Sequence, residues 1–363
     1  MRTSHFIFVL LMFLNFSSFG QTDTINNYQY FERHADSLLN KNQRDSAIAY
    51  YKKAFAIFPN SWKSYSALRR LGSEVSSDTM AILLQKLIPS NIQYLPNIVF
   101  GKGGNRNLRL TILKPKGIGS KRLPVIIYIH GGGWRENIKE LGVIALIQFV
   151  NRGYIGVAVE YRLSKEAKFP AQIEDVKCAI RFLRAKAIKY SINPEKIGIW
   201  GQSAGGHLAS LTGTSGGIKS LEGNGGWKNY NSRVQAVCDW SGPSCFPPDT
   251  ITSNASFKFF GGTTADKADL AKEASPLTYI TADDPPFLIF HGTADAVVKM
   301  AQSDTLYKSL KKANIDATLK LFEGGGHFAV YGAQVGEISG DMPGFRTEMM
   351  NLMNDFFDNR LKR

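Results

Sequence analysis

The feature that most constrains this fold is a five-residue turn, Gly-Gln-Ser-Ala-Gly at residues 201–205. An apolar run at 197–200 precedes the turn, and a stretch of small residues with alanine and leucine follows it. A turn this tight between a strand and a helix forces its central residue into a strained backbone conformation with φ above zero. Side chains at Gly201 and Gly205 would collide with the neighbouring strand and helix. The segment therefore predicts a sharp strand-to-helix turn that exposes the Ser203 hydroxyl. An ordinary glycine-rich turn is the alternative.

Short apolar runs alternate with longer helical patterns from about residue 108 to the end of the chain. PVIIYIH at 124–130 and PFLIFHG at 286–292 are two such runs, each rich in β-branched or aromatic residues. This alternation is typical of βαβ units, so we predict an α/β fold with a doubly wound, mostly parallel sheet. Residues 242–280 interrupt the rhythm with proline, serine, threonine and phenylalanine, and they predict an insertion over the site.

Residues 21–95 differ from the rest because they show helical patterns and no strand pattern. Part of this segment matches the spacing of a tetratricopeptide repeat that begins near Tyr28. The matching residues are Phe31, Ala35, Leu38, Ala47, Tyr51, Ala54 and Pro59. An unrelated helical hairpin is the alternative. One repeat cannot bury its own apolar face. We therefore expect the module to pack on the main domain at 96–363, or on a protein partner.

The first twenty residues have the pattern of a secretory signal peptide. Arg2 gives a basic start, residues 6–16 are almost wholly apolar, and Ser18 and Gly20 are small residues before a cleavage point. The apolar run is short for a transmembrane helix, and an uncleaved anchor is the alternative. We therefore expect residues 1–20 to be removed, leaving a periplasmic or secreted protein that is not held at the membrane.

The chain is basic, with 44 Lys and Arg against 30 Asp and Glu and a formal net charge of +14. Such an excess suits nucleic acid, an anionic surface or an acidic polymer. The basic residues are scattered, and no nucleic-acid-binding motif accompanies them. Nucleic acid is therefore not predicted as a partner.

The three cysteines are an odd number, so at least one thiol has no partner within the chain. Cys178 lies in a predicted helix and is expected to be buried. Cys238 and Cys245 are near in sequence and would be able to form a disulfide in an oxidising compartment. A chain of this size does not need one, so both states stay open.

A serine hydroxyl becomes a good nucleophile only beside a base. His327 follows three glycines, just after the last predicted strand, and a loop at that place can reach across to Ser203. His207 lies one turn along the same helix as Ser203 and cannot turn back to it. We therefore predict His327 as the base.

The base needs an acid to orient it, on a loop after a strand and between serine and histidine in the chain. Asp295 meets both conditions, whereas Asp283 and Asp284 precede that strand. The order serine, acid, histidine is the one that accompanies this kind of turn. Ser203, Asp295 and His327 thus form a predicted catalytic triad.

Acyl transfer also requires hydrogen-bond donors for the developing oxyanion. The three glycines after His130 allow the backbone N–H groups of Gly132 and Gly133 to approach a substrate carbonyl, and the N–H of Ala204 would be a third donor. His130 itself is expected to bond loop backbone. No metal-binding pattern occurs in the sequence, and no cofactor is predicted.

Five segments together resemble α/β-hydrolase esterases of the hormone-sensitive-lipase-like branch, above all bacterial bifunctional feruloyl and acetyl xylan esterases. These segments are IHGGGW, VEYRLSKEAKFPAQIEDVKCAIRFLRAKA, WGQSAGGHLASL, DPPFLIFHGTADAVV and GGGHF. The resemblance covers residues 97–355 and implies the same triad and oxyanion hole. It also implies a structural role for Asp175. The helical module lies outside the usual family pattern.

Two classes of function follow. The first is a secreted serine carboxylic-ester hydrolase for short acyl esters, acetyl or feruloyl, of plant polysaccharide or oligosaccharide. Trp134 and Trp240, with Phe246, are predicted to wall its substrate pocket. A serine peptidase or a lipid esterase of the same fold is the alternative among enzymes. The second class is a non-catalytic scaffold, in which the helical module would bind a protein partner.

Overall fold

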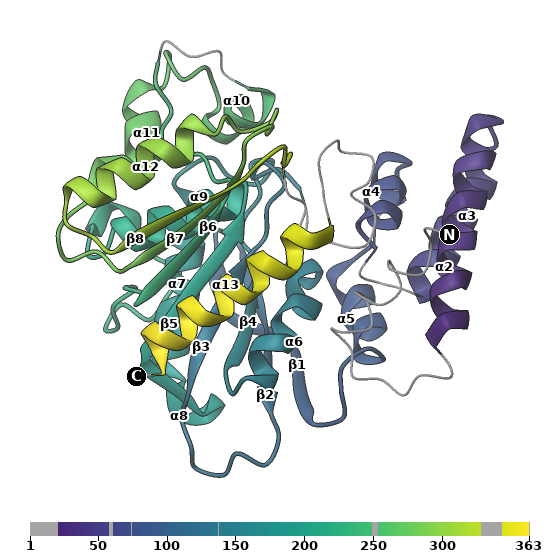
Figure 1. The fold of residues 1–363 in the computed structure, drawn as a ribbon, viewed down its shortest axis with the longest axis horizontal. Helices are drawn as coiled ribbons and strands as arrows, with labels where there is room; N and C mark the ends of the chain where they lie inside the picture. Colours follow the sequence, from purple (N-terminus) through teal and green to yellow (C-terminus); the bar gives the residue numbers. More distant parts are fainter. Residues whose placement is uncertain are drawn as a thin grey trace.

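The computed structural model describes residues 21–57, 61–73, 75–136, 138–248, 253–327 and 343–362. Within this part, four helices from the N-terminal region stand beside a larger body built on one sheet (Figure 1). The predicted signal peptide lies outside the described residues. No helix in the described ranges has both the length and the apolar character needed to cross a membrane.

The described part contains an eight-stranded sheet with the order β1-β2-β4-β3-β5-β6-β7-β8. The strands are β1 Ile92–Gly103, β2 Arg106–Pro115, β3 Leu123–Ile129, β4 Ile155–Val159, β5 Ile192–Gln202, β6 Ala236–Trp240, β7 Phe287–Gly292 and β8 Ala317–Phe322. β1 and β2 are antiparallel to their neighbours, and all strands from β4 to β8 along the sheet are parallel. The predicted mostly parallel sheet is confirmed.

Apolar side chains cover both faces of the sheet. Along β3, Val125 and Ile127 belong to one buried cluster, whereas Ile126 and Tyr128 belong to the other. The first cluster is completed by α7 Ala171–Ala185, α9 Ala204–Thr214 and α12 Ala301–Lys312. The second is completed by α6 Val143–Asn151, which follows the 3-10 helix η1 Lys139–Gly142, and by α13 Pro343–Leu361, which crosses the sheet in Figure 1. A short helix, α8 Ala187–Tyr190, follows α7.

The N-terminal module consists of α2 Gln21–Asn40, α3 Arg44–Ile57, α4 Trp62–Arg70 and α5 Ser77–Gln85. Helices α2 and α3 pack against each other, and the small residues Ala35 and Ala47 are fully buried between them. This agrees with the predicted helical hairpin. The tetratricopeptide assignment itself stays a prediction, and Pro59, one of the matching residues, lies outside the described residues.

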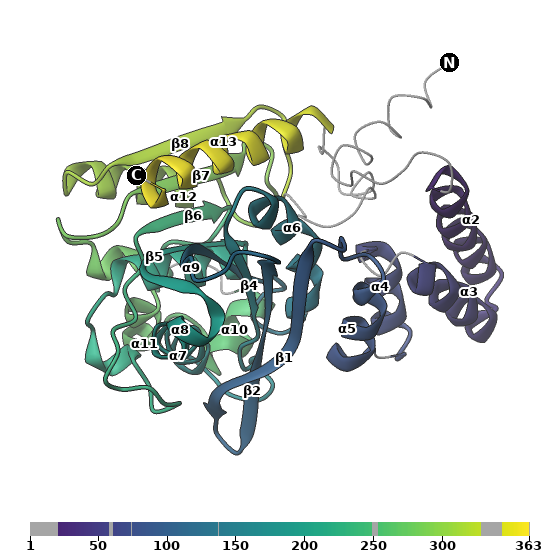
Figure 2. The ribbon, with the colours of Figure 1, turned by 90° about the horizontal axis from the view of Figure 1, so that it is seen from below.

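The module packs on the larger body through α4 and α5. Figure 2 shows these two helices between the body and the outermost pair α2 and α3. Leu68 and Leu84 of the module share a buried cluster with Leu113 of β2 and Ile126 of β3. The apolar face of the module therefore continues into the core of the sheet, as expected for a unit too small to bury its own face.

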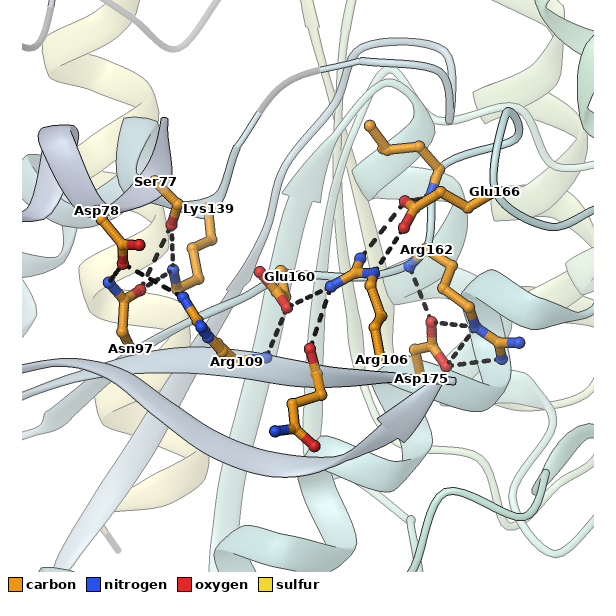
Figure 3. Close-up of polar contacts among 12 residues, drawn as sticks. Ser77, Asp78, Asn97, Arg106, Arg109, Lys139, Glu160, Arg162, Glu166 and Asp175 are labelled. Carbon is orange, nitrogen blue, oxygen red and sulfur yellow. Dashed lines mark hydrogen bonds and ion pairs between the residues drawn. The ribbon is translucent and has the colours of Figure 1, made fainter. Parts of the chain in front are cut away.

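A buried polar network fastens the same contact. The Lys139 ammonium, whose side chain is fully buried, donates to Ser77 Oγ at 2.8 Å and to Asn97 Oδ1 at 2.8 Å (Figure 3). It also pairs with the buried carboxylate of Glu140. Ser77 in turn donates to Glu140 at 2.6 Å. Each charge has an internal partner, so removing one would leave the other buried and unpaired.

The predicted boundary at residues 95 and 96 falls inside β1, which begins at Ile92. Pro96 and Asn97 interrupt the strand at a register shift between Leu95 and Ile98. This irregularity breaks the two-residue alternation by which a strand is recognised in a sequence. Residues 92–95, which the sequence pattern assigned to the module, therefore belong to the sheet.

The predicted insertion lies between β6 and β7. Its described part contains α10 Asn254–Phe260, α11 Ala268–Glu273 and the 3-10 helix η3 Pro276–Tyr279. Helices α10 and α11 gather at one end of the sheet in Figure 1. The Phe169 N–H donates to the Phe259 carbonyl at 3.0 Å, which ties α10 to the chain before α7.

All three cysteines are free thiols. Cys178 and Cys238 are fully buried, and the Trp240 indole N–H points at the Cys238 sulfur at 3.2 Å. The Cys245 thiol points instead at the side-chain oxygen of Gln302 at 3.6 Å. The disulfide left open by the sequence is therefore not formed in this structure.

Candidate active site

Ser203 sits between β5 and α9 with φ +56° and ψ −122°, the strained conformation that the sequence predicts. A Cβ atom on Gly201 would lie 2.4 Å from the backbone of Gly205, and one on Gly205 would lie 2.1 Å from the Ile129 carbonyl oxygen. Both distances are far below a normal contact. The two glycines are therefore required by the turn itself.

Backbone contacts hold the turn in place from both sides. The Ser203 N–H donates to the Trp240 carbonyl at 2.7 Å, and the Ser203 carbonyl accepts from the His207 N–H at 2.9 Å. The first bond ties the turn to the end of β6, and the second begins α9. The serine side chain is consequently presented at the edge where the parallel strands end, which is where open α/β sheets bind ligands.

His327 and Asp295 meet at the same edge, in the loops that follow β8 and β7. The His327 Nδ1–H donates to Asp295 Oδ2 at 2.6 Å. This bond fixes the tautomer and leaves Nε2 of the ring able to accept a proton. Among the described residues, the Ser203 hydroxyl makes no hydrogen bond to this ring. The acid and the histidine are thus in direct contact in the structure. The serine is placed at the same edge by the backbone of its own turn.

The surroundings of Asp295 favour its ionised form. Burial alone would raise the pKa of this carboxyl group, but hydrogen bonds from His291 and His327 and from the Val298 amide hold it well below its usual range. Oδ1 accepts from the Val297 and Val298 N–H groups at 2.8 and 2.9 Å. A carboxylate fixed in this way can orient an imidazole and stabilise its protonated form.

His291 is a member of this group that the sequence did not assign. Its Nε2–H lies 2.8 Å from the Val298 carbonyl and 3.2 Å from Asp295 Oδ2, while Nδ1 accepts from the Ser303 hydroxyl at 2.7 Å. His291 therefore contacts the same carboxylate oxygen, Oδ2, that accepts from His327. The spacing of four residues between His291 and Asp295 is the sequence signal that would have suggested a link.

The loop after β3 reaches the serine, as the predicted oxyanion hole requires. A Cβ atom on Gly131 would lie 2.8 Å from the Gln202 carbonyl oxygen and 3.5 Å from the Ser203 Cβ. Gly132 and Gly133 have φ values of +103° and +59°, which glycine adopts most readily. Ala204 is the first residue of α9, directly after the serine. The three predicted donors belong to segments that lie together, and their role in binding an oxyanion stays a prediction.

The remaining histidines near the site have structural contacts. His130 donates through Nδ1 to the Gly131 carbonyl at 2.9 Å and stacks on Tyr161, as predicted for a loop-bonding residue. Burial lowers the pKa of His130 to about 4, and it does the same to His207. Both rings are thus neutral at physiological pH. In the described ranges, no cluster of His, Cys, Asp or Glu is arranged to hold a metal ion.

The predicted pocket walls are not where the sequence expected them. The Trp134 side chain is only 2% exposed, stacks on Phe259 at 4.3 Å and donates to His207 Nδ1 at 3.2 Å. Phe246 packs against the edge of the same cluster. The Trp240 side chain is 3% exposed in the opposite core, against Trp200. Both tryptophans fill the interior in this structure, so neither lines an open substrate pocket.

Asp175 has the structural role that the resemblance implied. It accepts from the Arg162 N–H at 2.8 Å and from the guanidinium at 2.8–3.1 Å, which joins α7 to the segment after β4 (Figure 3). Burial raises the pKa of Asp175 to about 6 despite these donors. The pair lies among backbone contacts and contributes no group to the serine.

A family model named BD-FAE matches residues 110–310, more than half of the chain. The match includes Ser203 and Asp295 and ends before His327. Esterase LipQ of Mycobacterium tuberculosis is 32% identical over 223 residues, which are 60% of this chain and 52% of LipQ. The chain spans about half the length of the curated relatives that it matches.

Two solved structures share the fold. A truncated carbohydrate esterase from gut microbiota is 31% identical with a TM-score of 0.65, and the match covers 75% of this chain and 97% of that one. An esterase of the planctomycete Thermogutta terrifontis, solved with propionate bound, is 25% identical with a TM-score of 0.61, covering 74% of this chain and 94% of that one. With the strained serine, the glycine loop and the paired acid and histidine at one sheet edge, these matches show that the chain belongs to the BD-FAE family of α/β-hydrolases.

Proposed function

We propose that the chain is an exported serine carboxylic-ester hydrolase that removes a short acyl group, acetyl, or else the aromatic feruloyl group, from plant polysaccharide or its oligosaccharides. One observation carries the proposal: the strained Ser203 turn lies at the same sheet edge as the hydrogen-bonded pair of His327 and Asp295. The names of the similar proteins, an esterase and a carbohydrate esterase, support the same reaction and substrate class.

The reaction follows from the roles that these groups can take. Ser203 Oγ attacks the ester carbonyl while Nε2 of His327 takes its proton. The Nδ1–H of His327 stays bonded to Asp295, whose negative charge stabilises the imidazolium. The imidazolium then gives its proton to the alkoxide as the C–O bond breaks, which leaves an acyl-serine. A water molecule, activated by the same ring, attacks the acyl group and releases the acid.

Backbone N–H groups stabilise the negative oxygen of each tetrahedral intermediate. Gly132, Gly133 and Ala204 are the proposed donors, because their segments adjoin Ser203. A single donor of this kind is worth about 10²–10³-fold in kcat in enzymes of similar chemistry. No metal or cofactor enters the scheme.

A preference for short acyl groups is supported by the packing beside the serine. Trp134, His207, Phe246 and Phe259 form a closed aromatic cluster next to the turn, and none of these side chains is more than 8% exposed. Within the described residues, these side chains pack against one another and leave little exposed surface for a long acyl chain. A related esterase with propionate bound accepts an acid of this size.

Export is part of the proposal and depends on the first twenty residues. Their basic start, apolar run and small residues before position 21 match a signal peptide. Acylated plant polysaccharide is found outside the cytoplasm, so the predicted export is consistent with the proposed substrate. N-terminal sequencing of protein recovered from the periplasm or the medium would test the cleavage point, and retention in the membrane fraction would contradict it.

The reaction class is tested by labelling with a fluorophosphonate. The parent protein should label stoichiometrically, and Ser203→Ala should neither label nor turn over p-nitrophenyl acetate while keeping its melting temperature. Labelling of Ser203→Ala would refute the serine assignment. A fully inert parent would favour a scaffold.

A panel of substrates then separates the alternatives within the fold. We expect hydrolysis of p-nitrophenyl acetate and not of aminoacyl p-nitroanilides, and release of acetate from acetylated xylo-oligosaccharides. Activity should decline from acetyl to octanoyl esters, by roughly 1–3 kcal/mol in transition-state free energy for each poorly accommodated methylene. A maximum at C8 or longer, with no acetate from the oligosaccharide, would identify a lipid esterase instead.

A further inference from the structure

A basic hollow of about 460 Å³ lies beside the glycine loop of the candidate active site. It is lined by Arg135, Glu136, Ser164, Lys165, Lys168 and Lys258, which come from the segment after Gly133, the loop before α7 and helix α10. The volume falls in the range of small-molecule sites. Three separate segments of the chain therefore converge on a space the size of a small ligand.

The charges of this hollow are largely unopposed. Four cationic side chains face one carboxylate, that of Glu136. Within the described ranges, none of the four cations forms an ion pair with an acidic side chain. The nearby Glu166 is engaged elsewhere, since it accepts from Arg106 at 2.6 Å and from the Leu163 N–H at 2.8 Å (Figure 3). The hollow thus keeps a net positive charge that an anion would neutralise.

Two of the cations are held in position. The Lys168 ammonium donates to the carbonyls of Ser164 and Lys258, each at 2.9 Å, so it bridges the loop before α7 and helix α10. Arg135 donates to the Asn254 side chain at 3.3 Å. These contacts fix the groups without cancelling their charge, which lowers the entropic cost of binding an anion there.

Arg135 also has an unused donor that faces the catalytic loop. Its Nε is buried and has no hydrogen-bond partner in the described part of the chain. A Cβ atom placed on Gly133 would lie 3.7 Å from this nitrogen, so the donor lies beside the glycine loop. A buried donor without a partner is unfavourable unless a ligand supplies an acceptor.

We propose that this hollow is a subsite for a carboxylate on the substrate, such as the uronic acid side group of an acylated saccharide. The inference rests on the proposed esterase function and adds the substrate class, an acidic saccharide in place of a neutral one. A guanidinium suits a planar carboxylate, and the flanking lysines add charge at longer range. The ester would lie at Ser203 and the uronic acid beyond Gly133, against α10.

The test compares two substrates that differ in one group. Acetylated xylo-oligosaccharides are prepared with and without a glucuronic acid side group, and the release of acetate is measured on each. The parent should prefer the acidic substrate in kcat/KM. The double variant Lys165→Gln/Lys258→Gln should lower the acidic-to-neutral ratio of kcat/KM by about three- to tenfold, mainly through KM, because both lysines are exposed and partly screened. Added salt should lower the parent ratio in the same direction.

A matched control removes the same charge elsewhere. Lys121→Gln/Arg122→Gln acts on two exposed cations just before β3, at the end of that strand opposite the glycine loop, and should leave the ratio unchanged. Equal ratios for the parent and both double variants, with acetate released from both substrates, would overturn the subsite alone. No acetate from either substrate and no hydrolysis of p-nitrophenyl acetate would overturn the esterase function with it. Arg135→Gln should lower the ratio further, by about tenfold or more, because the proposed subsite places its guanidinium against the carboxylate.

Discussion

The neighbouring strands β6 and β7 each carry a buried aspartate near their carboxyl ends, and the pKa values of the two carboxyl groups are shifted in opposite directions. Asp239 of β6 is fully buried, and burial raises its pKa to about 6 although the Ser210 hydroxyl and the Gly242 N–H donate to it. Asp295 after β7 is also buried, yet its pKa is depressed by two histidines and two backbone amides. The difference shows that the number and kind of donors decide the direction of the pKa shift, since burial is common to both.

The proposed catalysis depends on the lowered pKa of Asp295. A carboxylate that orients a histidine must stay ionised through the working pH range, and Asp295 has four donors to keep it so. Asp239 braces the turn instead, because a Cβ atom on Gly206 would lie 2.3 Å from its Oδ1. Two aspartates on adjacent strands thus serve catalysis and packing respectively.

The largest effect is expected from a substitution of Asp295, the catalytic member of the two aspartates. Asp295→Asn should lower kcat by about 10⁴-fold, because an amide cannot hold His327 in the required tautomer. Asp239→Asn is the matched variant and should keep kcat within about tenfold of the parent. Steady-state kinetics with p-nitrophenyl acetate would measure both. Equal losses in the two variants would contradict the distinction between the two strands.

A smaller effect is expected when one donor to Asp295 is removed, which makes the surroundings of its carboxylate more like those of Asp239. His291→Phe removes one donor to the carboxylate and should lower kcat/KM by roughly 10–100-fold, since a hydrogen bond to a charged group contributes about 1.5–3 kcal/mol. The pKa of the Asp295 carboxyl group should rise toward its ordinary value, which an NMR titration of that group would measure. His291→Gln, which can keep a donor near the position of Nε2, should restore most of kcat/KM. An unchanged Asp295 pKa in His291→Phe would argue against this positioning role.

The smallest effect concerns stability. The folded protein keeps the proton on Asp239 up to pH about 6, whereas the unfolded chain loses it near its ordinary value. The folded state therefore binds more protons between about pH 4 and 6, and the free energy of unfolding should fall as pH rises through that window, by on the order of 2 kcal/mol from this group. Asp239→Asn should flatten this slope. Urea unfolding at pH 4.5 and 7 would measure the change, and an identical slope in both proteins would contradict the raised pKa.

Local steric rules made the centre of the site predictable. Glycine at 201 and 205 follows from the geometry of one turn, and the structure shows that turn with Ser203 at positive φ. Asp295 and His327 followed from a topological rule, because loops after adjacent parallel strands open at the same edge. Their hydrogen bond at 2.6 Å agrees with that expectation.

Contacts that depend on packing across the fold were not predictable in the same way. Trp240 alternates with Val237 and Asp239 along β6, and its face was decided by the helices that cover each side. The strand period places it with Cys238, so the sequence held a weak signal of its burial. The spacing of four residues hinted at the contact of His291 with Asp295, but its other partners, the Val298 carbonyl and the Ser303 hydroxyl, lie 7 and 12 residues away and no local pattern encodes their approach.

The buried network of Ser77, Asn97, Lys139 and Glu140 sets a limit on modularity. A gene fusion or a domain exchange that cut the chain at residue 96 would divide β1. It would also remove Ser77 of α5, the hydrogen-bond partner of the fully buried Lys139 and Glu140 side chains. The smallest portable hydrolase unit consequently begins before Ser77. The outer pair α2 and α3 can be replaced more freely than α5, because Ser77 of α5 is hydrogen-bonded to Lys139 and Glu140 of the larger body.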